Sequence, residues 1–306
     1  MGERWAAAVE RGLPHRPMLR PGVRAVRSDD RHLRVGLGPD AVLLPDLPAT
    51  RDLLGRLAEG RSAVGWDEVT TPLARRLVES GLLVDGEEFW AAVRDGRRRG
   101  VSREVVADVF AGGDDHGHRL RRRLGSWVAL DVPDGWRPGI TDLLAASGVV
   151  TRPADEESLP AARLLARLGE PRRDLLDPWM RSGEPHLLLR LVEGGLTVGP
   201  FVEAGLTACC RCVDAHLSER DPRRPLVVEQ YADPTGARLV PEPVSPSLLA
   251  LGWAMAAHDL VTYVEGGEPA TWSATITIGR DLAVERVRWA RHACCGCGWG
   301  DQWDVV

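Results

Sequence analysis

Short apolar stretches alternate with turn residues at the start of the chain. Residues 23–28 (VRAVRS), 32–37 (HLRVGL) and 41–45 (AVLLP) are partly alternating segments of strand length. The turn sequences Ser28-Asp29-Asp30 and Gly38-Pro39-Asp40 separate them. Apolar alternation bounded by such turn residues predicts three short strands.

Helical spacing follows these strands. Residues 47–60 place leucines at helical intervals and end at Gly60, and a short helix is expected to begin near Trp66. Residues 71–81 predict a third helix, with Thr70 or Thr71 as its cap. Residues 82–89 are typical of a small wing strand. This order predicts a winged helix-turn-helix over residues 1–90.

The pattern becomes strongly charged over residues 91–124, which we interpret as a linker and a helix surface. From residue 125 onward, predicted strands alternate with predicted helices, which is typical of an α/β domain that ends in an antiparallel pair. The strands expected in residues 125–306 are 126–133, 149–153, a hairpin within 186–200, 271–279 and 282–290, and the expected helices are 141–148, 161–169 and 245–267.

Composition narrows the function classes. The net charge of -5 argues against a general nucleic-acid binder, and we expect no nucleic-acid partner. The chain contains no lysine, which removes phosphate-loop and Schiff-base chemistry. No apolar signal-peptide core and no apolar run of about 20 residues is present, so we expect a soluble, cytoplasmic protein without a membrane partner.

All six cysteines lie in two short stretches, TACCRC (207–212) and HACCGC (292–297). Cys209 and Cys212 form one C-x-x-C pair, whose two thiolates can turn toward a single ion. In the second stretch, Cys297 pairs with Cys294 as C-x-x-C or with Cys295 as C-x-C, and spacing alone favours Cys294. Two such pairs predict a four-cysteine structural zinc site, and a redox pair is the lesser alternative.

These cysteine stretches carry a resemblance to a known family. GPFVEAGLTACCRCVDAH (199–216), RDPRRP (220–225) and the ending WARHACCGCGW resemble the partner proteins of YcaO cyclodehydratases, which modify ribosomal peptides to thiazole/oxazole and thiopeptide products. The resemblance selects Cys295 and Cys297 in the second stretch. This chain departs from the family pattern at Ala293, where a proline is usual, and at Cys210, where a leucine is usual.

The resemblance implies an N-terminal leader-peptide recognition domain followed by a ThiF-like α/β domain with zinc. Such a protein binds the leader of a precursor peptide and presents the core to a separate YcaO subunit, which forms the azolines. ThiF-like relatives commonly pair, so a homodimer is expected. The first βα turn here has only Gly135 and Gly139, so we expect a degenerate Rossmann-type scaffold that binds no nucleotide. We therefore expect no catalytic residues and interpret the chain as a non-catalytic subunit of an ATP-dependent cyclodehydratase complex.

We expect the leader peptide to add as a strand between residues 41–45 and the third helix. Two alternatives stay open: an ATP-dependent adenylating ThiF-like enzyme, and a winged-helix transcription regulator. The residues predicted to contact the leader peptide are Leu43, Leu44, Leu73, Leu77 and Val78 as an apolar floor, with Arg75 and Arg76 as partners of leader carboxylates. For Leu73 and Leu77, a position in the core is the alternative.

Overall fold

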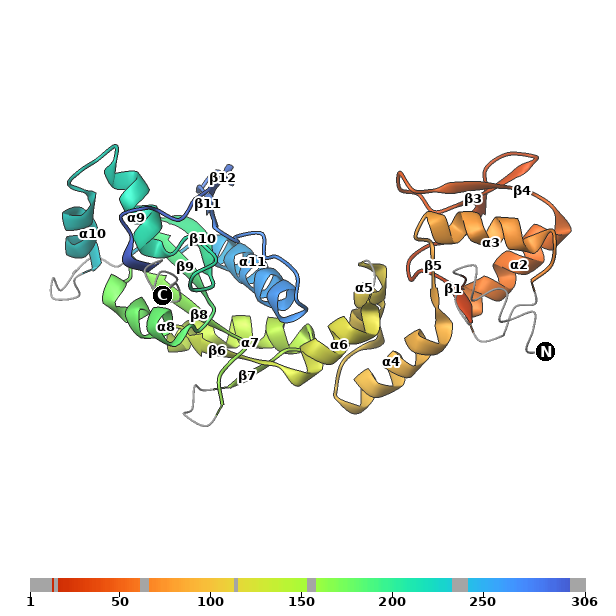
Figure 1. The fold of residues 1–306 in the computed structure, drawn as a ribbon, viewed down its shortest axis with the longest axis horizontal. Helices are drawn as coiled ribbons and strands as arrows, with labels where there is room; N and C mark the ends of the chain where they lie inside the picture. Colours follow the sequence, from red (N-terminus) through yellow and green to blue (C-terminus); the bar gives the residue numbers. More distant parts are fainter. Residues whose placement is uncertain are drawn as a thin grey trace, which may run out of the picture. The chain divides into compact units, whose positions relative to one another are not determined.

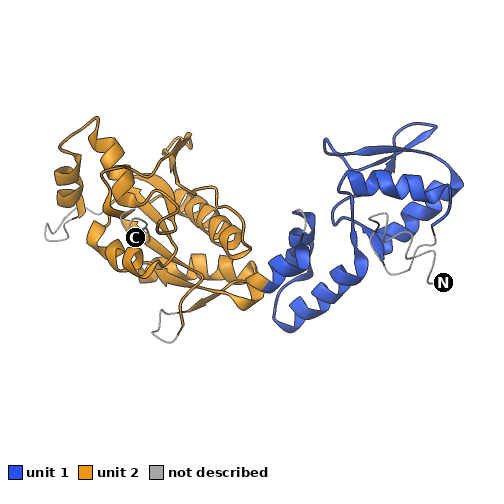
Figure 2. Cartoon of the chain, in the orientation of Figure 1, with its two compact units in different colours: residues 1–121 blue, residues 122–306 orange. Residues whose placement is uncertain are grey.

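The computed structural model describes residues 13, 16–60, 66–112, 115–152, 158–232 and 242–297. The chain divides into two compact units, Met1–Arg121 and Arg122–Val306 (Figure 2). Each unit has its own hydrophobic core and is described by itself below.

The first unit contains a three-stranded antiparallel sheet in the order β2-β3-β4, a two-stranded sheet of β1 and β5, and several helices (Figure 1). The bounds of its elements are β1 (Pro17–Leu19), β2 (Ala25–Arg27), β3 (His32–Val35), β4 (Val42–Pro45), α2 (Pro48–Glu59), α3 (Thr70–Glu79), β5 (Leu83–Asp85), α4 (Gly86–Arg98) and α5 (Arg103–Ala111), while α6 (His116–Gly125) reaches the second unit.

The three strands and the helices α2 and α3 lie where the sequence predicts them. The cap of α3 differs from the prediction, because the carboxylate of Asp67 accepts from the backbone N–H groups of Val69 and Thr70, 2.9 and 2.7 Å away. Residues 66–69 form no separate helix and lead directly into α3. The winged helix-turn-helix therefore stays a prediction, since residues 61–65 lie outside the described ranges.

The expected wing strand is shorter than predicted. β5 ends at Asp85, whose carboxylate accepts from the backbone N–H groups of Glu87 and Glu88 and so begins α4 at Gly86. The charged region, which was expected to combine a linker with a helix surface, is largely helical. Phe89 of α4 packs edge-on against Phe110 of α5 at 5.3 Å between ring centroids.

The second unit is built on a seven-stranded sheet in the order β12-β11-β10-β9-β8-β6-β7. The strands β7, β6, β8 and β9 are parallel, and β10, β11 and β12 continue the sheet antiparallel. Its elements are β6 (Trp127–Asp131), η1 (Asp134–Trp136), α7 (Arg137–Ala146), β7 (Val150–Arg152), β8 (Ala162–Leu168), η2 (Arg173–Leu176), α8 (Asp177–Ser182), β9 (His186–Val192), β10 (Gly195–Val202), α9 (Cys210–Ser218), α10 (Arg224–Ala232), α11 (Pro246–Val264), β11 (Ala274–Ile278) and β12 (Val284–Arg288).

Both faces of this sheet are covered, because neighbouring residues of its central strands belong to different cores. Leu164 and Leu187 pack with α7 and α11 in the main core. Leu165 and Leu188 pack on the opposite face with Leu176 of η2 and with Cys210 of α9. The cysteine-bearing helix α9 therefore rests on the second face of the sheet.

The prediction of a helix over residues 161–169 is wrong. The segment forms β8, between β6 and β9. A central parallel strand is buried on both faces and shows a continuous apolar run, which cannot be told from a short buried helix by periodicity. Its two arginines are accommodated by partners: Arg163 pairs with Glu184 and Arg167 with Asp131.

The longest helix, α11, begins after Ser245, whose hydroxyl accepts from the backbone N–H of Leu248. Within the described residues it is the single helix whose length and apolar composition would allow it to cross a membrane. It packs against β9, β10 and α7, as the core helix of an α/β unit does.

Candidate metal centre

Four cysteine thiols meet at one point of the second unit. The Sγ atoms of Cys209, Cys212, Cys295 and Cys297 all lie within 4.8 Å of one another. Individual Sγ–Sγ distances are 3.8 Å for Cys209–Cys212, 3.6 Å for Cys209–Cys295 and 3.4 Å for Cys212–Cys297. Metal–sulfur bonds of about 2.3 Å place the corners of a tetrahedron about 3.8 Å apart, so the four thiols fit a single ion.

The first pair of thiols is positioned by the start of α9. Cys209 lies at the N-cap and Cys212 lies one turn later, which brings both thiols to the same side of the helix. The preceding turn is fixed by Thr207, whose hydroxyl accepts from the backbone N–H of Glu203 at 2.8 Å. The backbone N–H of Ala208 donates to the hydroxyl of Ser273, which ties this turn to the segment before β11.

The second pair is Cys295 and Cys297. Cys295 is buried in the cluster, whereas Cys294 is exposed and is not among its four thiols. Spacing alone favoured Cys294. In the structure, the backbone N–H of Cys295 donates to the carbonyl of His292 and closes a tight turn, and Cys295 rather than Cys294 joins the cluster. The C-x-C arrangement implied by the family resemblance is the one that the structure brings together.

The thiols influence one another's protonation. The pKa of Cys212 is lowered to about 4, chiefly because the thiol of Cys209 donates a hydrogen bond to it. The same bond, together with burial, raises the pKa of Cys209. Burial first, and then the contact with Cys212, raises the pKa of Cys297 to about 12. One thiolate is thus favoured by the site itself, and a bound cation would supply the charge that favours the others.

A second layer of side chains supports this cluster. The Nδ1 atom of His292 accepts from the backbone N–H of Cys294 at 3.1 Å, so Nε2 carries the proton and donates to Glu219 at 3.1 Å. On α9, Nε2 of His216 donates to the carbonyl of Ala290 at 3.0 Å. These bonds join the helix that carries the first pair to the segment that carries the second.

The sequence prediction missed this second layer. The sequence does hold a signal for it, because a histidine lies close to each cysteine pair. His216 follows Cys212 by four residues, and His292 precedes Cys295 by three. Metal-bound residues commonly depend on such hydrogen-bonded neighbours for their orientation.

The sixth cysteine, Cys210, does not join the cluster. It points to the sheet, packs with Leu165, Leu176 and Leu188, and is fully buried. Burial raises its pKa to about 11, which favours the thiol over the thiolate. Cys210 thus serves an apolar packing role.

A buried ionic network holds α9 against η2. The guanidinium of Arg173 bonds to both oxygens of Asp214 on α9, at 2.6 and 3.1 Å. Glu170 accepts from Arg173 at 3.0 Å and also pairs with Arg190 at 3.1 Å. Because Cys212 and Asp214 lie on the same helix, this network also fixes the position of the cluster.

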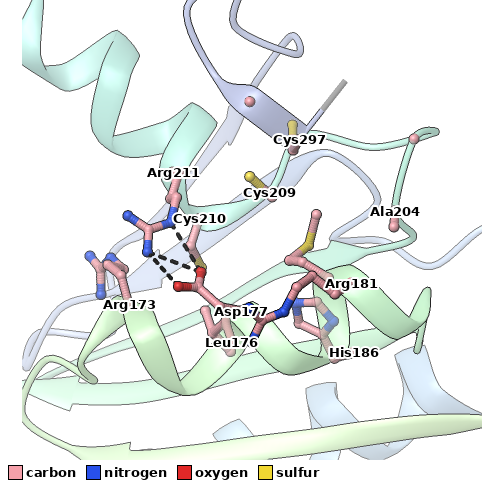
Figure 3. A pocket seen from close by; sticks show the side chains of 13 residues that line it. Arg173, Leu176, Asp177, Arg181, His186, Ala204, Cys209, Cys210, Arg211 and Cys297 are labelled. Carbon is pink, nitrogen blue, oxygen red and sulfur yellow. Dashed lines mark hydrogen bonds and ion pairs between the residues drawn. The ribbon is translucent and has the colours of Figure 1, made fainter. Parts of the chain in front are cut away.

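A cavity of about 630 Å³ opens beside the thiols (Figure 3). Cys209 and Cys297 form one wall, and Arg211 and Asp177, which bond to each other at 3.0 Å, lie on another. His186 also lines it; its Nδ1 donates to the carbonyl of Glu184 at 2.9 Å, and burial lowers its pKa. The cavity leaves the cluster accessible from one side.

The residues predicted to contact a peptide divide into two groups. Leu44, Leu73 and Leu77 are buried in the core of the first unit, so they support the fold. Leu43, Arg75 and Arg76 are exposed, and Val78 is half-buried. Only this second group could touch a ligand directly.

The turn between β6 and α7 differs from a phosphate-binding loop. It contains Pro133 and the short helix η1, and α7 begins at Arg137. A Cβ atom at Gly139 would lie 3.3 Å from the ring of Trp253, so this glycine allows α7 to approach α11. The guanidinium of Arg137 donates to the carbonyls of Leu130 and Val132 at the end of β6.

The comparisons with known proteins concern the fold. No protein-family model and no curated protein matches the sequence. Among solved structures, a heterocyclase in complex with substrate and cofactor is 17% identical (TM-score 0.64), and the heterocyclase TruD is 17% identical (TM-score 0.62). The match to the substrate-bound heterocyclase covers 92% of this chain and 39% of that heterocyclase. The match to TruD covers 93% of this chain and 43% of TruD.

A third match is similar in length to this chain. The E. coli protein MccB, solved with MccA-N7isoASN, is 13% identical (TM-score 0.62), and the match covers 92% of this chain and 99% of MccB. The chain therefore has the fold shared by MccB and by a part, about two fifths, of these heterocyclases.

Proposed function

We propose that the protein is a recognition and presentation subunit in the biosynthesis of ribosomally made, thiazole/oxazole-type peptides. Its first unit binds the leader of a precursor peptide, and a separate YcaO cyclodehydratase forms the azolines on the core. The observation that carries the proposal is the match over more than nine tenths of this chain to less than half of each heterocyclase. The remaining part of each heterocyclase lies outside the match, and we assign its role to the YcaO cyclodehydratase.

The leader groove that we propose lies between β4 and α3. In the β3–β4 ladder, the backbone N–H and C=O groups of Leu44 point toward its partner Leu33 on β3. The backbone groups of the next residue, Leu43, therefore point to the open side of β4. Arg75 and Arg76 on α3 are exposed and have no ionic partner among the described residues. An extended peptide with carboxylates would find backbone partners on β4 and cations on α3.

Binding of a leader segment by the R75A/R76A variant tests this groove. The expected result is a loss of affinity of about tenfold or more, since charge-assisted hydrogen bonds to carboxylates would be removed. The matched control is R97A/R98A on α4, which removes the same charge elsewhere on this unit. Unchanged affinity in R75A/R76A would exclude the two arginines as leader contacts.

We further propose zinc as the ion of the four-cysteine centre. Four thiolates complete a tetrahedral shell and leave no open position, which is typical of a structural zinc site. Its role would be to fasten α9 to the C-terminal stretch. Metal analysis of the purified protein, with one zinc expected per chain, tests the assignment.

A second candidate function is an ATP-dependent adenylating enzyme. It is favoured by the match to MccB, one of whose structures holds AMPCPP, over nearly its whole length. The proline-containing turn after β6 and the absence of lysine favour the non-catalytic subunit instead. Titration with ATP separates the two, because only the adenylating enzyme requires nucleotide binding.

A further inference from the structure

We propose a second docking site on the first unit: a groove along the free edge of β2 that binds an acidic, extended segment of a partner polypeptide as an added strand. This site lies at the opposite edge of the sheet from β4, so the inference goes beyond the leader groove and does not depend on it.

The backbone of β2 is open for such pairing. The backbone N–H of Ser28 bonds to the carbonyl of His32, and that of Gly36 bonds to the carbonyl of Arg24. Bonded and non-bonded pairs alternate along an antiparallel ladder, so Ala25 and Arg27 turn their N–H and C=O groups away from β3. The backbone groups of these two residues make no other hydrogen bond to backbone within the part of the chain that the structure describes. The edge therefore offers two complete donor and acceptor sets at the spacing of a strand.

A groove runs beside this edge. A cavity of about 730 Å³ lies between β2, the preceding segment and helix α2. Its apolar lining includes Val23, Leu54 and Ala58, together with Trp90 of α4. Every second side chain of an added strand would face this lining, which is the arrangement that gives specificity in strand addition.

The charge of the groove selects an acidic partner. Four arginines line it, namely Arg20, Arg24, Arg27 and Arg51, and no carboxylate does. Arg27 and Arg51 already share Asp46, at 3.5 and 2.6 Å. Arg20 and Arg24 have no side-chain partner among the described residues and are free to pair with carboxylates on an incoming strand.

The other edge of the sheet is less suited to the same pairing. The outward-facing positions of β4 are Leu43 and Pro45, and Pro45 has no N–H to donate. The β2 edge thus presents one more backbone donor than the β4 edge, in a groove with a larger positive charge.

A glycine provides a direct way to block the groove. Gly55 lies on α2 in the lining of the cavity, and a Cβ atom there would meet no atom within 4 Å. The G55L variant would place a side chain at the groove from a Cβ position that is open, and it also removes a glycine from a helix interior, which favours the helix. The matched control is A49L, an exposed position on α2 outside the lining.

A backbone variant tests strand pairing itself. A25P removes one outward N–H and leaves the ladder bonds to β3 in place, which is where an edge strand tolerates proline. The charge variant R20S/R24S removes the two unpaired cations, and R75S/R76S applies the same charge change beside the opposite edge. Thermal unfolding of each variant checks that the fold is retained.

The probe is a fluorescent nonapeptide that alternates glutamate and valine, followed by anisotropy on the full chain. Saturable binding is expected, reduced about tenfold or more in G55L, A25P and R20S/R24S and retained in A49L and R75S/R76S. Replacement of glutamate by glutamine in the probe should weaken binding as strongly. Absence of wild-type binding up to about 1 mM peptide, or binding that G55L and A25P leave unchanged, would overturn the proposal.

Discussion

His292 and Glu219 are joined by a hydrogen bond of 3.1 Å from Nε2 to a carboxylate oxygen, across 73 residues of sequence. On its other side, the same imidazole accepts the backbone N–H of Cys294. The ring therefore connects the end of α9 to the turn that presents Cys295. These two hydrogen bonds link the two cysteine pairs without requiring a bound ion.

This linkage predicts the effect of substitution at His292. H292A is expected to weaken metal retention about 10- to 100-fold, because the turn that presents Cys295 loses its acceptor. H292N keeps an acceptor near the position of Nδ1 and should recover part of the loss. Competition with a chromogenic chelator measures both variants. Equal retention in H292A and in the wild type would show that the imidazole does not position the second pair.

The two neighbouring cysteines are expected to behave differently. C295S removes one of the four clustered thiols, so bound metal per chain should fall and the melting temperature should drop. C294S changes an exposed thiol outside the cluster and should leave the metal content at the wild-type value. Elemental analysis of the two purified variants provides the comparison. Loss of metal in C294S with retention in C295S would reverse the ligand assignment.

The network around Arg173 makes a prediction about stability. R173A leaves the carboxylates of Asp214 and Glu170 without their shared cation in a buried setting, and a loss of about 3 kcal/mol or more is expected in the free energy of unfolding. The neighbouring R172A removes an exposed pair with Asp174 and should cost less than about 1 kcal/mol. Urea unfolding of the two variants measures the difference, and similar losses would contradict a special role for the buried network.

Acid should destabilise the second unit through His186. Burial lowers the pKa of His186 in the folded protein, whereas in the unfolded chain an ordinary value of about 6.5 applies. Below that value the unfolded chain binds a proton that the folded protein does not, so the free energy of unfolding falls as the pH drops, by at most about 1.4 kcal/mol per pH unit.

The variant H186Q tests this pH dependence, since glutamine does not titrate. Urea unfolding at about pH 7.5 and pH 5.5 should show a smaller difference for H186Q than for the wild type. H258Q, at an exposed histidine of α11, should keep the wild-type difference. An unchanged difference in H186Q would remove His186 as its source.

The sequence predicted those parts of the fold and the site in which local signals agree with tertiary structure. The long helix α11, the hairpin of β9 and β10, and the final strand pair were predicted because turn residues and apolar periodicity coincide there. β8 was missed because a strand buried on both faces carries no strand period.

The candidate site shows the same contrast. Cysteine spacing identified the four-thiol centre but gave preference to Cys294, because spacing does not report the turn at His292. Leu44, Leu73 and Leu77 were expected in a peptide groove, yet an apolar residue beside a groove and one beneath it look alike in a sequence. Partners distant in sequence, such as Arg173 with Asp214, leave no local signal.

The most direct test of the central claim is isothermal titration of the full chain with the leader segment of a precursor peptide encoded beside its gene, and separately with ATP. A recognition subunit predicts saturable leader binding at one site per chain and no heat from ATP. Clear ATP binding without leader binding would contradict the account and would favour the adenylating enzyme.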